Sequence, residues 1–549
     1  MTDQSNAILR VEQLCVNTAE GRPILQDISF DIRAGETVCL VGESGSGKSV
    51  TSLAALGLLP KGALQATSGR VLLDDEDVLQ VSNARLKALR GSRMAMIFQE
   101  PMTALNPVIS VGRQIEEVLQ THTDLGAAQR RAQVMNALAQ VHLPDIERIH
   151  DAYPHQLSGG QRQRIMIAMA LVLEPRLLIA DEPTTALDVT TQQQILKLIR
   201  ELQQKHGTAV LFITHDMGVV VDIADRVCVM RQGRMVETGA VGEVLSRPRE
   251  AYTKALLAAV PSLAPRAARQ APQRAQVVLD VSELGKVYPT AGGGWRWFGK
   301  TREGTRAVHD VSFTLSRGRT LGIVGESGSG KSTVARCVMR LLNPSHGAIR
   351  VTGKEISELS AASLKPHRKR IQMIFQDPNR SLNPRITIGR SLVEGPMNHG
   401  VPVDRAWARG QQLLELVGLP PDAIERYPHQ FSGGQRQRIA IARALAMEPD
   451  VIVADEAVSA LDVSVQAQVL QLLDDIQQRL GVAILFITHD LRVAAQLCDD
   501  VLVMQRGQVI EYGPAAQVLA APREPYTRQL MDAVSGKGWD FATGQRTPA

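Results

Sequence analysis

The chain is poor in cysteine and has no long apolar run. Its five cysteines lie far apart and form no Cys-x-x-Cys pair, which argues against a zinc site and a disulfide framework. The longest apolar segments, such as residues 165–173, fall well short of the ~20 residues needed to cross a bilayer. The amino terminus also lacks a basic stretch followed by an apolar run. We therefore expect a cytoplasmic chain unless a partner holds it at a membrane.

An excess of charge of one sign is also missing. Lys and Arg number 61 against 56 Asp and Glu, the formal net charge is +5, and the two signs are interspersed along most of the sequence. Proteins that bind nucleic acid gather their basic residues on one face. The composition therefore predicts no nucleic-acid partner.

The sequence does contain a long internal repeat. Four motifs recur in the same order: GESGSGKS at 42–49 and 325–332, SGGQRQRI at 158–165 and 432–439, FITHD at 212–216 and 486–490, and PRE-x-YT from 248 and 522. From SGGQ onward the spacing between the copies is constant. Residues 261–276 between the halves contain three prolines and three arginines, which is typical of a linker. We therefore predict a first domain over 1–260, a linker over 261–276 and a second domain over 277–549, each domain ending in the same extension.

The glycine-rich motif stands between an apolar run and a segment of helical character, the context of a phosphate loop. Its glycines let backbone N–H groups point at phosphates. Lys48 is expected to reach the β- and γ-phosphates, and Ser49 to bind Mg²⁺; Lys331 and Ser332 are expected to do so in the second half.

Paired carboxylates follow a short apolar run in each half. LLIADE and VIVADE are typical of buried parallel strands with acidic residues at their carboxyl ends. Asp181 and Asp455 suit the Mg²⁺ hydration shell, and Glu182 and Glu456 can polarise the attacking water.

Two further motifs point to phosphate. His215 and His489 each follow an apolar run, which places them at strand ends near the γ-phosphate. The SGGQ motif precedes a helix, so its serine is expected to cap that helix and to expose N–H groups that bind an anion.

Together these motifs resemble the nucleotide-binding domain of ATP-binding cassette (ABC) proteins, twice, over nearly the whole chain. The resemblance implies an α/β chain of two tandem P-loop NTPase domains, each with a RecA-like core, an antiparallel β subdomain and a helical signature subdomain. It also implies that the SGGQ signature of one domain closes over ATP bound to the other. Ser432 and Gly434 would then act at the site of Lys48, and Ser158 and Gly160 at the site of Lys331. Because neither half has lost its glutamate or its signature serine, we expect two hydrolytic sites.

The resemblance assigns the site residues one by one. The expected ATP contacts of the first half are Gly42, Glu43, Ser44, Gly45, Ser46, Gly47, Lys48, Ser49, Val50, Gln99, Ser158, Gly159, Gly160 and Gln161. Those of the second half are Tyr288, Gly325, Glu326, Ser327, Gly328, Ser329, Gly330, Lys331, Ser332, Thr333, Gln376, Ser432, Gly433, Gly434 and Gln435. The expected Mg²⁺ ligands are Ser49, Gln99, Asp181, Ser332, Gln376 and Asp455, and the expected catalytic residues are Glu182, His215, Glu456 and His489.

One expected contact differs between the halves. Tyr288 fits the position at which the family stacks an aromatic ring on adenine, whereas the first half offers Thr18 there. Stacking is worth about 1 kcal/mol. The first site is therefore expected to hold nucleotide more weakly.

Three classes of ABC protein contain two cassettes without membrane helices and compete as interpretations: importer subunits, ribosome-associated proteins and DNA-repair ATPases. The short, proline-broken linker disfavours the ribosomal class, and the absence of cysteine pairs and of an inserted coiled coil disfavours the repair class. The importer class gains support from EPMTALNP at 100–107, DPNRSLNP at 377–384, YPHQ from 153 and 427, and the PRE-x-YT tails. These resemble the oligopeptide, dipeptide and nickel importer branch, and DEAVSALD at 455–462 is most similar to glutathione-import ATPases.

That branch implies an ATPase that energises peptide import through two separate permease subunits. A periplasmic solute-binding protein would deliver the substrate to these permeases. The protein would lie peripherally on the cytoplasmic face of the bacterial inner membrane. The segments between Gln99 and Ser158, and between Gln376 and Ser432, would form helical subdomains that receive the permeases. Some members of the branch carry an iron–sulfur cluster on cysteines of the tail after YT; neither tail contains a cysteine here, so no cluster is expected. Nickel import and a ribosomal role remain the alternatives.

Residues 292–306, GGGWRWFGKTREGTR, are an insertion found only in the second half. Its tryptophans and basic residues suit contact with lipid headgroups or a permease. A solvated loop that extends a hairpin is an equally good interpretation.

Overall fold

The computed structural model describes residues 7–185, 187–267, 269, 276–289, 304–459 and 461–546. These residues fall into two compact units. The first contains the chain up to Val260 together with residues from Val534 onward, and the second contains the chain from Pro261 to Ala533. The structure thus joins the start of the predicted linker to the second unit, and the end of the predicted second domain to the first unit.

Each unit is built on a six-stranded sheet. In the first unit the order is β10 (Arg234–Ala240), β9 (Arg226–Arg231), β3 (Thr37–Val41), β8 (Ala209–Thr214), β7 (Leu177–Asp181) and β6 (Met94–Ile97). All neighbours are parallel except β10 and β9. Every residue of β3, β7 and β8 is buried, as expected for strands covered on both faces.

A second, antiparallel sheet packs against one side of this core. Its order is β2 (Pro23–Arg33), β1 (Ala7–Thr18), β4 (Leu64–Leu73) and β5 (Glu76–Asp77). Leu9 and Ile28 of this sheet share one hydrophobic cluster with Leu40 and Leu211 of the six-stranded sheet. One continuous core therefore joins the two sheets.

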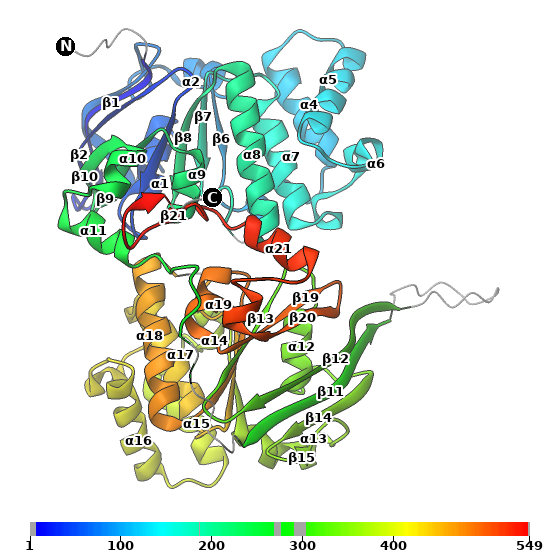
Figure 1. Ribbon diagram of the computed structural model, residues 1–549. Coiled ribbons are helices and arrows are strands. Elements are labelled where there is room, and N and C mark those ends of the chain that lie inside the picture. Colours follow the sequence, from blue (N-terminus) through cyan, green and yellow to red (C-terminus); the bar gives the residue numbers. More distant parts are fainter. Residues whose placement is uncertain are drawn as a thin grey trace, which may run out of the picture. The chain divides into compact units, whose positions relative to one another are not determined.

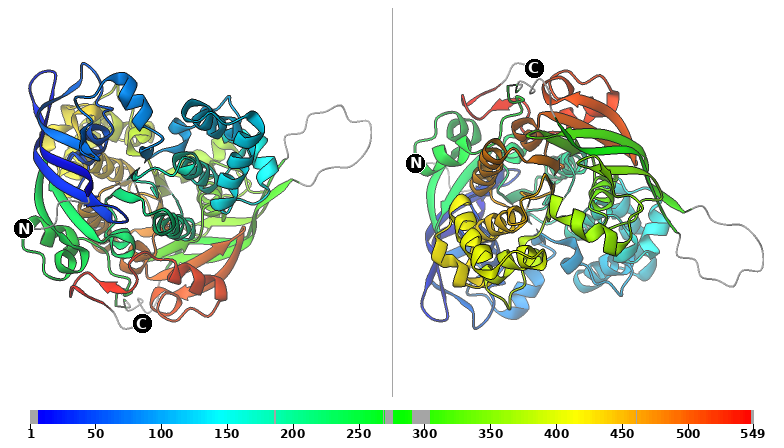
Figure 2. Two further views of the ribbon diagram at one scale, coloured as in Figure 1. Left: turned by 90° about the horizontal axis from the view of Figure 1, so that it is seen from above. Right: turned by 90° about the horizontal axis from the view of Figure 1, so that it is seen from below.

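Helices complete the first unit. In chain order they are α1 (Lys48–Ala55), α2 (Asn83–Leu89), α3 (Pro101–Ala104), α4 (Val111–His122), α5 (Ala127–Gln140), α6 (Ile146–Asp151), α7 (Gly159–Leu171), α8 (Val189–His206), α9 (Met217–Ile223), α10 (Val241–Ser246) and α11 (Ala251–Ala258). Helices α4 to α6 and the antiparallel sheet lie on opposite sides of this unit (Figures 1 and 2). The helical subdomain predicted before the SGGQ motif is thus confirmed.

The second unit repeats this plan. Its core sheet has the order β16 (Ile371–Ile374), β17 (Val451–Asp455), β18 (Ala483–Ile487), β13 (Thr320–Val324), β19 (Asp500–Gln505) and β20 (Gln508–Pro514). Its antiparallel sheet has the order β12 (Thr305–Ser316), β11 (Val277–Tyr288), β14 (His346–Val351) and β15 (Lys354–Glu355). The predicted α/β architecture is confirmed in both halves.

The helices of the second unit are α12 (Lys331–Val338), α13 (Ala361–Leu364), α14 (Pro378–Ser381), α15 (Ile388–Asn398), α16 (Val403–Leu416), α17 (Gly433–Leu445), α18 (Val463–Leu480), α19 (Leu491–Leu497), α20 (Ala515–Val518) and α21 (Pro525–Asp532). A small hairpin of β21 (Trp539–Asp540) and β22 (Gln545–Arg546) ends the described chain and belongs to the first unit. Among the described residues, no helix is both long and apolar enough to span a bilayer. Of the 292–306 insertion, only residues from 304 onward are described, and they lead into β12.

Candidate nucleotide sites

The predicted phosphate loop connects β3 to α1 in the first unit and β13 to α12 in the second. Its shape depends on glycine. Gly42 has a φ of 151°, and a Cβ there would lie 2.3 Å from the carbonyl oxygen of Met230. Gly325 has a φ of 146° and would approach Met504 in the same way, at 2.2 Å. At these positions any side chain would collide with backbone, so the sequence pattern reflects a steric requirement.

The lysine of each loop is buried and folded back over it. Lys48 Nζ donates to the carbonyl oxygens of Gly42 at 2.7 Å and Glu43 at 3.0 Å. Lys331 Nζ donates to the equivalent carbonyls of Gly325 at 2.8 Å and Glu326 at 2.7 Å. Each ammonium group is therefore held inside the curve of the loop, where a phosphate would meet it.

Each loop also contains a buried hydroxyl that fits a ligand. Ser46 Oγ and Ser329 Oγ are buried and have no hydrogen-bond partner among the described residues. A buried polar atom without a partner is costly. A phosphate oxygen bound in each loop would accept a hydrogen bond from the hydroxyl of that loop. Both serines therefore fit a nucleotide site.

The expected Mg²⁺ ligands meet in pairs. Ser49 Oγ donates to Asp181 at 3.3 Å, and Ser332 Oγ donates to Asp455 at 3.0 Å. Burial raises the pKa of both aspartates, and the serine hydrogen bonds oppose that shift. A hydroxyl and a carboxylate beside a phosphate loop form an oxygen donor set that suits Mg²⁺.

The predicted catalytic glutamate of the first unit is the centre of a small network. Glu182 accepts hydrogen bonds from Gln99 Nε2 at 2.8 Å and Thr185 Oγ1 at 3.0 Å, and His215 Nδ1 lies 3.2 Å from its other oxygen. Glu182 also has a φ of 46°, a conformation that non-glycine residues adopt uncommonly.

The second unit repeats this arrangement. Gln376 Nε2 donates to Glu456 at 2.8 Å, His489 Nδ1 lies 3.5 Å from the other oxygen, and the φ of Glu456 is 47°. One contact differs. Thr185 donates to the carboxylate of Glu182, whereas the equivalent Ser459 donates to the backbone oxygen of Glu456. Sequence reasoning did not include Thr185 or Ser459, although a hydroxyl residue stands three positions after each glutamate.

The electrostatics of the network keep these glutamates ionised. Burial alone would raise the pKa of Glu182, but the hydrogen bond and charge of His215, with Thr185 and Lys48, outweigh it and lower the pKa. The same balance, with His489 and Lys331, lowers the pKa of Glu456. An ionised carboxylate can accept a proton from an attacking water.

Each signature segment begins a helix in the predicted way. Ser158 accepts from the N–H of Gln161 at 3.3 Å, and the Gln161 side chain accepts from the N–H of Ser158 at 3.0 Å, which forms a capping box at the start of α7. Ser432 and Gln435 do the same for α17. The N–H groups of the first turn thus face outward from a positively polarised helix end.

The two glycines of the signature have different roles. A Cβ on Gly160 would lie 2.8 Å from Thr191 Cγ2, so this glycine allows α7 to pack closely on α8. A Cβ on Gly159 would meet nothing within 4 Å. The equivalent residues behave alike: Gly434 would meet Val465 Cγ1 at 2.2 Å, and Gly433 would meet nothing.

The proposed adenine position ends a strand of the antiparallel sheet in each unit. Tyr288 is the last residue of β11, is 36% exposed, and has the ammonium of Lys286 at 5.5 Å from its ring centre. Thr18 is the last residue of β1 and accepts a hydrogen bond from the N–H of Arg22. At this position the second unit therefore offers an exposed aromatic ring, and the first unit offers a threonine.

Comparisons with known proteins agree with this geometry. The family profile described as ABC transporter matches residues 25–185 and 308–459. The profile described as oligopeptide/dipeptide transporter, C-terminal region, matches residues 236–291 and 510–538. The first profile matches once in each half, and the second matches near the end of each half, its first match continuing through the linker to residue 291, so the predicted resemblance to this branch is confirmed.

Curated relatives match almost the whole chain. The glutathione import ATP-binding protein GsiA of Salmonella paratyphi A is 48% identical over 94% of this chain and 87% of the relative. The corresponding protein of Escherichia coli K12 is 49% identical over 93% and 86%. The peptidoglycan transport ATP-binding protein YejF of Agrobacterium fabrum is 48% identical over 92% of each. With two complete cassettes and relatives of this kind, the chain belongs to the ABC transporter family as an ATP-hydrolysing subunit.

Proposed function

We propose that this protein hydrolyses ATP to energise the import of peptides, of dipeptide, oligopeptide or glutathione type, through separate membrane permease subunits. The observation that carries the proposal is the pair of Gln–Glu–His networks at Glu182 and Glu456, each beside a phosphate loop. The names of the relatives and the match to the oligopeptide/dipeptide C-terminal region support the substrate class.

The chemistry follows from the residues around each loop. In the first site Lys48 would neutralise the β- and γ-phosphates, and Ser49, Asp181 and Gln99 would hold Mg²⁺, which supplies charge stabilisation for phosphoryl transfer. Glu182 would accept the proton of the attacking water, while His215 orients that carboxylate. Lys331, Ser332, Asp455, Gln376, Glu456 and His489 would act in the same way in the second site.

We further propose that each ATP is bound between a phosphate loop and the signature of the other cassette. Gly159 and Gly433 are the first residues of α7 and α17, and a Cβ on either would meet no atom within 4 Å, so the positively polarised helix ends that support this proposal are open at these residues. Because the two cassettes are covalently joined, their closure is intramolecular and favoured by a high effective concentration. Hydrolysis then reopens the pair.

Permease subunits are proposed to dock beside Gln99 and Gln376. In the first unit the apolar side chains Phe98, Met102 and Val108 near this glutamine in the sequence are exposed, and so is Tyr153 just before the signature. Phe375 and Tyr427 are exposed at the equivalent places of the second unit. A coupling segment seated there would move each glutamine, and with it the hydrogen bond to the catalytic glutamate.

The remaining assignments come from the family. A periplasmic solute-binding protein would deliver the substrate to the permeases, and this protein would lie peripherally on the cytoplasmic face of the bacterial inner membrane. The test is reconstitution in lipid vesicles with the two permease subunits of a peptide importer of this branch. We expect peptide-stimulated, Mg²⁺-dependent ATP hydrolysis and uptake of peptide. Uptake of Ni²⁺ without peptide, or co-sedimentation with ribosomes and no binding to permeases, would overturn the proposal.

A further inference from the structure

The last helix of each half is followed by a segment that joins the opposite unit. The first unit stops at Val260 and resumes at Val534, and the second begins at Pro261 and stops at Ala533. Because the spacing of the repeats is constant in this region, Pro261 corresponds to Ser535. Both crossings therefore occur at equivalent places, within one residue. We call residues 534–546 the tail segment and residues 261–267 and 269 the linker segment.

The tail segment docks on α9, the helix that starts two residues after His215. The carbonyl oxygen of Ser535 lies so close to Gly218 that a Cβ there would be only 2.5 Å away. The N–H of Gly536 donates to both carboxylate oxygens of Asp222 at 3.1 Å. Trp539 and Phe541 are buried in the main hydrophobic cluster of the first unit. The tail segment is thus part of the packed structure of this unit.

A short series of contacts connects the tail segment to the ATP site. Gln192 Nε2 donates to Ser535 Oγ at 3.1 Å and to Asp216 Oδ2 at 3.3 Å. The other oxygen of Asp216 caps α9 by accepting from the N–H of Gly218 at 2.8 Å. Asp216 is the residue next to His215, whose ring contacts Glu182. The tail segment therefore fixes the turn that presents the catalytic histidine.

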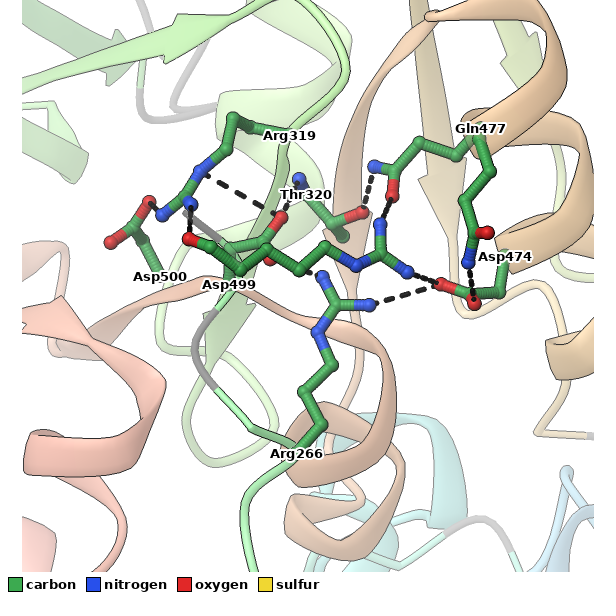
Figure 3. Close-up of polar contacts among 9 residues, drawn as sticks. Arg266, Arg319, Thr320, Asp474, Gln477, Asp499 and Asp500 are labelled. Atoms are coloured by element: carbon green, nitrogen blue, oxygen red, sulfur yellow. Dashed lines mark hydrogen bonds and ion pairs between the residues drawn. The ribbon is translucent and has the colours of Figure 1, made fainter. Parts of the chain in front are cut away.

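The linker segment docks on α19, the equivalent helix of the second unit. The buried Arg492 donates to the carbonyl oxygen of Pro261 at 3.2 Å, and the N–H of Arg266 donates to Ala495 at 2.9 Å. Arg266 also pairs with Asp474 at 3.0 Å and with the buried Asp499, as Figure 3 shows.

Further pairs extend this cluster. Arg269 pairs with Asp474 and with the side chain of Gln477, and Gln477 donates to Thr320, the first residue of β13. Arg319 reaches both Asp500, at 2.9 Å, and Asp499. The linker segment is thus held mainly by ions, whereas buried aromatic rings hold the tail segment.

The two docking places are not interchangeable. The residue that corresponds to Asp474 in the first unit is Arg200, which would repel Arg266 and Arg269. The residue that corresponds to Gly218 in the second unit is Arg492, which would fill the space that Ser535 occupies. Each segment therefore fits one unit only.

We propose that the tail and linker segments are positioning elements of the two ATP sites: each fixes the helix after the catalytic histidine of the unit in which it is docked. Each site then depends on the segment that follows the last helix of the other half. The proposal rests on the roles proposed above for the glutamates and histidines, and it gives a positioning role to residues that contact the helix after each histidine.

The test uses two glycines of the tail segment. Gly536 has a φ of 64°, and a Cβ there would lie 2.7 Å from Gly218 Cα, so Gly536→Val should displace the segment from α9. Gly538, two residues on, has no atom within 4 Å of its Cβ position and no left-handed φ, so Gly538→Val is the matched control. Both are made in the full chain that carries Glu456→Gln, which leaves only the first site able to hydrolyse.

We expect Gly536→Val to lower the single-turnover rate of ATP hydrolysis about tenfold, because a displaced catalytic group slows chemistry more than binding. The half-saturating ATP concentration should change less than about twofold, and Gly538→Val should change neither quantity. In the chain that carries Glu182→Gln, which isolates the second site, Gly536→Val should have no effect. Equal losses at both sites, or an unchanged rate at the first, would overturn the proposal. Activity in the Glu182→Gln, Glu456→Gln chain would instead refute the proposed catalytic roles.

The linker segment provides an independent test that a general loss of folding cannot imitate. Asp474→Arg should lower the second-site rate about tenfold by repelling Arg266 and Arg269. Adding Arg269→Asp to that variant should restore the rate to within about threefold, because this ion pair reforms with reversed sign while Arg266 keeps its pair with Asp499. Absence of rescue, together with an unchanged melting temperature, would overturn the proposal for this unit.

Discussion

The two cassettes agree at the atoms that would carry out chemistry and differ in the residues around them. The Gln–Glu distance is 2.8 Å in both, and the Ser–Asp and His–Glu contacts differ by 0.3 Å or less: 3.3 against 3.0 Å and 3.2 against 3.5 Å. Both glutamates also share the same rare backbone conformation. Such agreement supports the proposal that both sites hydrolyse ATP.

The differences lie where a partner, a base or a neighbouring segment would be bound. Thr103 and Val108 of the first unit are replaced by Arg380 and Arg385 in the second. Thr18 corresponds to Tyr288, and the docking places of the tail and linker segments differ as described above. The two halves therefore perform one reaction while they contact different surroundings.

The largest expected effect concerns the shared chemistry. Glu182→Gln combined with Glu456→Gln should lower ATP hydrolysis by at least about 10²-fold, since each amide cannot accept the proton of water. ATP binding, measured by equilibrium dialysis, should persist. Either single variant should retain a measurable share of the activity, because the other site is complete.

Matched controls exist for this experiment. Glu174 and Glu448 also stand at equivalent positions with a φ of 50°, but their side chains are largely exposed. Glu174→Gln and Glu448→Gln should leave hydrolysis unchanged. Undiminished turnover in the Glu182→Gln, Glu456→Gln protein would show that these carboxylates are not the bases.

Much of this arrangement could be predicted from sequence because it is local. The glycines of the phosphate loop, the apolar runs that become buried strands, and the serine caps of α7 and α17 each carry a short pattern with one physical meaning. The hydrogen bonds from Gln99 and Gln376 are not local, because they join residues about 80 positions apart. These two glutamines could be predicted as site residues only through the resemblance to known cassettes.

The positions of the tail and linker segments could not be predicted. Residues 534–546 show no apolar periodicity, and the unit on which they dock is decided by Gly218, by Asp222 and by the core that surrounds Trp539 and Phe541. The arginines at 266 and 269 looked like solvated linker charge, because their partners Asp474 and Asp499 are more than two hundred residues away. Contacts between residues so far apart in the sequence depend on the complete fold and leave no short pattern in the sequence.

The next prediction sharpens the contrast between the proposed permease surfaces. Val108→Arg exchanges an apolar surface residue of the first unit for a basic one, and Arg385→Val makes the reverse exchange in the second unit. We expect each to lower peptide uptake by the reconstituted transporter about tenfold, because charges in contact surfaces discriminate between partners. ATP hydrolysis by the isolated protein should not change. Equal uptake by wild type and both variants would show that these residues do not face the permeases.

A smaller effect is expected at the adenine position. Tyr288→Thr should weaken ATP binding to the second site about fivefold, which corresponds to the ~1 kcal/mol of an aromatic stack. Thr18→Tyr should strengthen the first site by a similar factor. Binding of a fluorescent ATP analogue, with hydrolysis blocked at both glutamates, separates the two affinities. Equal affinities of the two wild-type sites would contradict this assignment.

The smallest effect concerns proton binding by the histidine of the second site. Burial alone would lower the pKa of His489, but the hydrogen bond and charge of Glu456 outweigh it and raise the pKa above its ordinary value. The stabilisation from this pair is therefore fully present below the ordinary histidine pKa and is lost as pH rises through the raised one. Glu456→Gln removes the carboxylate and leaves the burial, so the pKa of His489 should fall below the ordinary value.

Histidine-selective NMR, with the resonance assigned by His489→Gln, measures both titrations. Glu448→Gln is the control, because it removes an exposed carboxylate at a position unrelated to the site. A titration of His489 that is the same in Glu456→Gln and in wild type would mean that the 3.5 Å pair does not form in solution. The histidine would then have to be oriented by the turn at Asp490 alone, and the second site would depend still more strongly on the docking of the linker segment against α19.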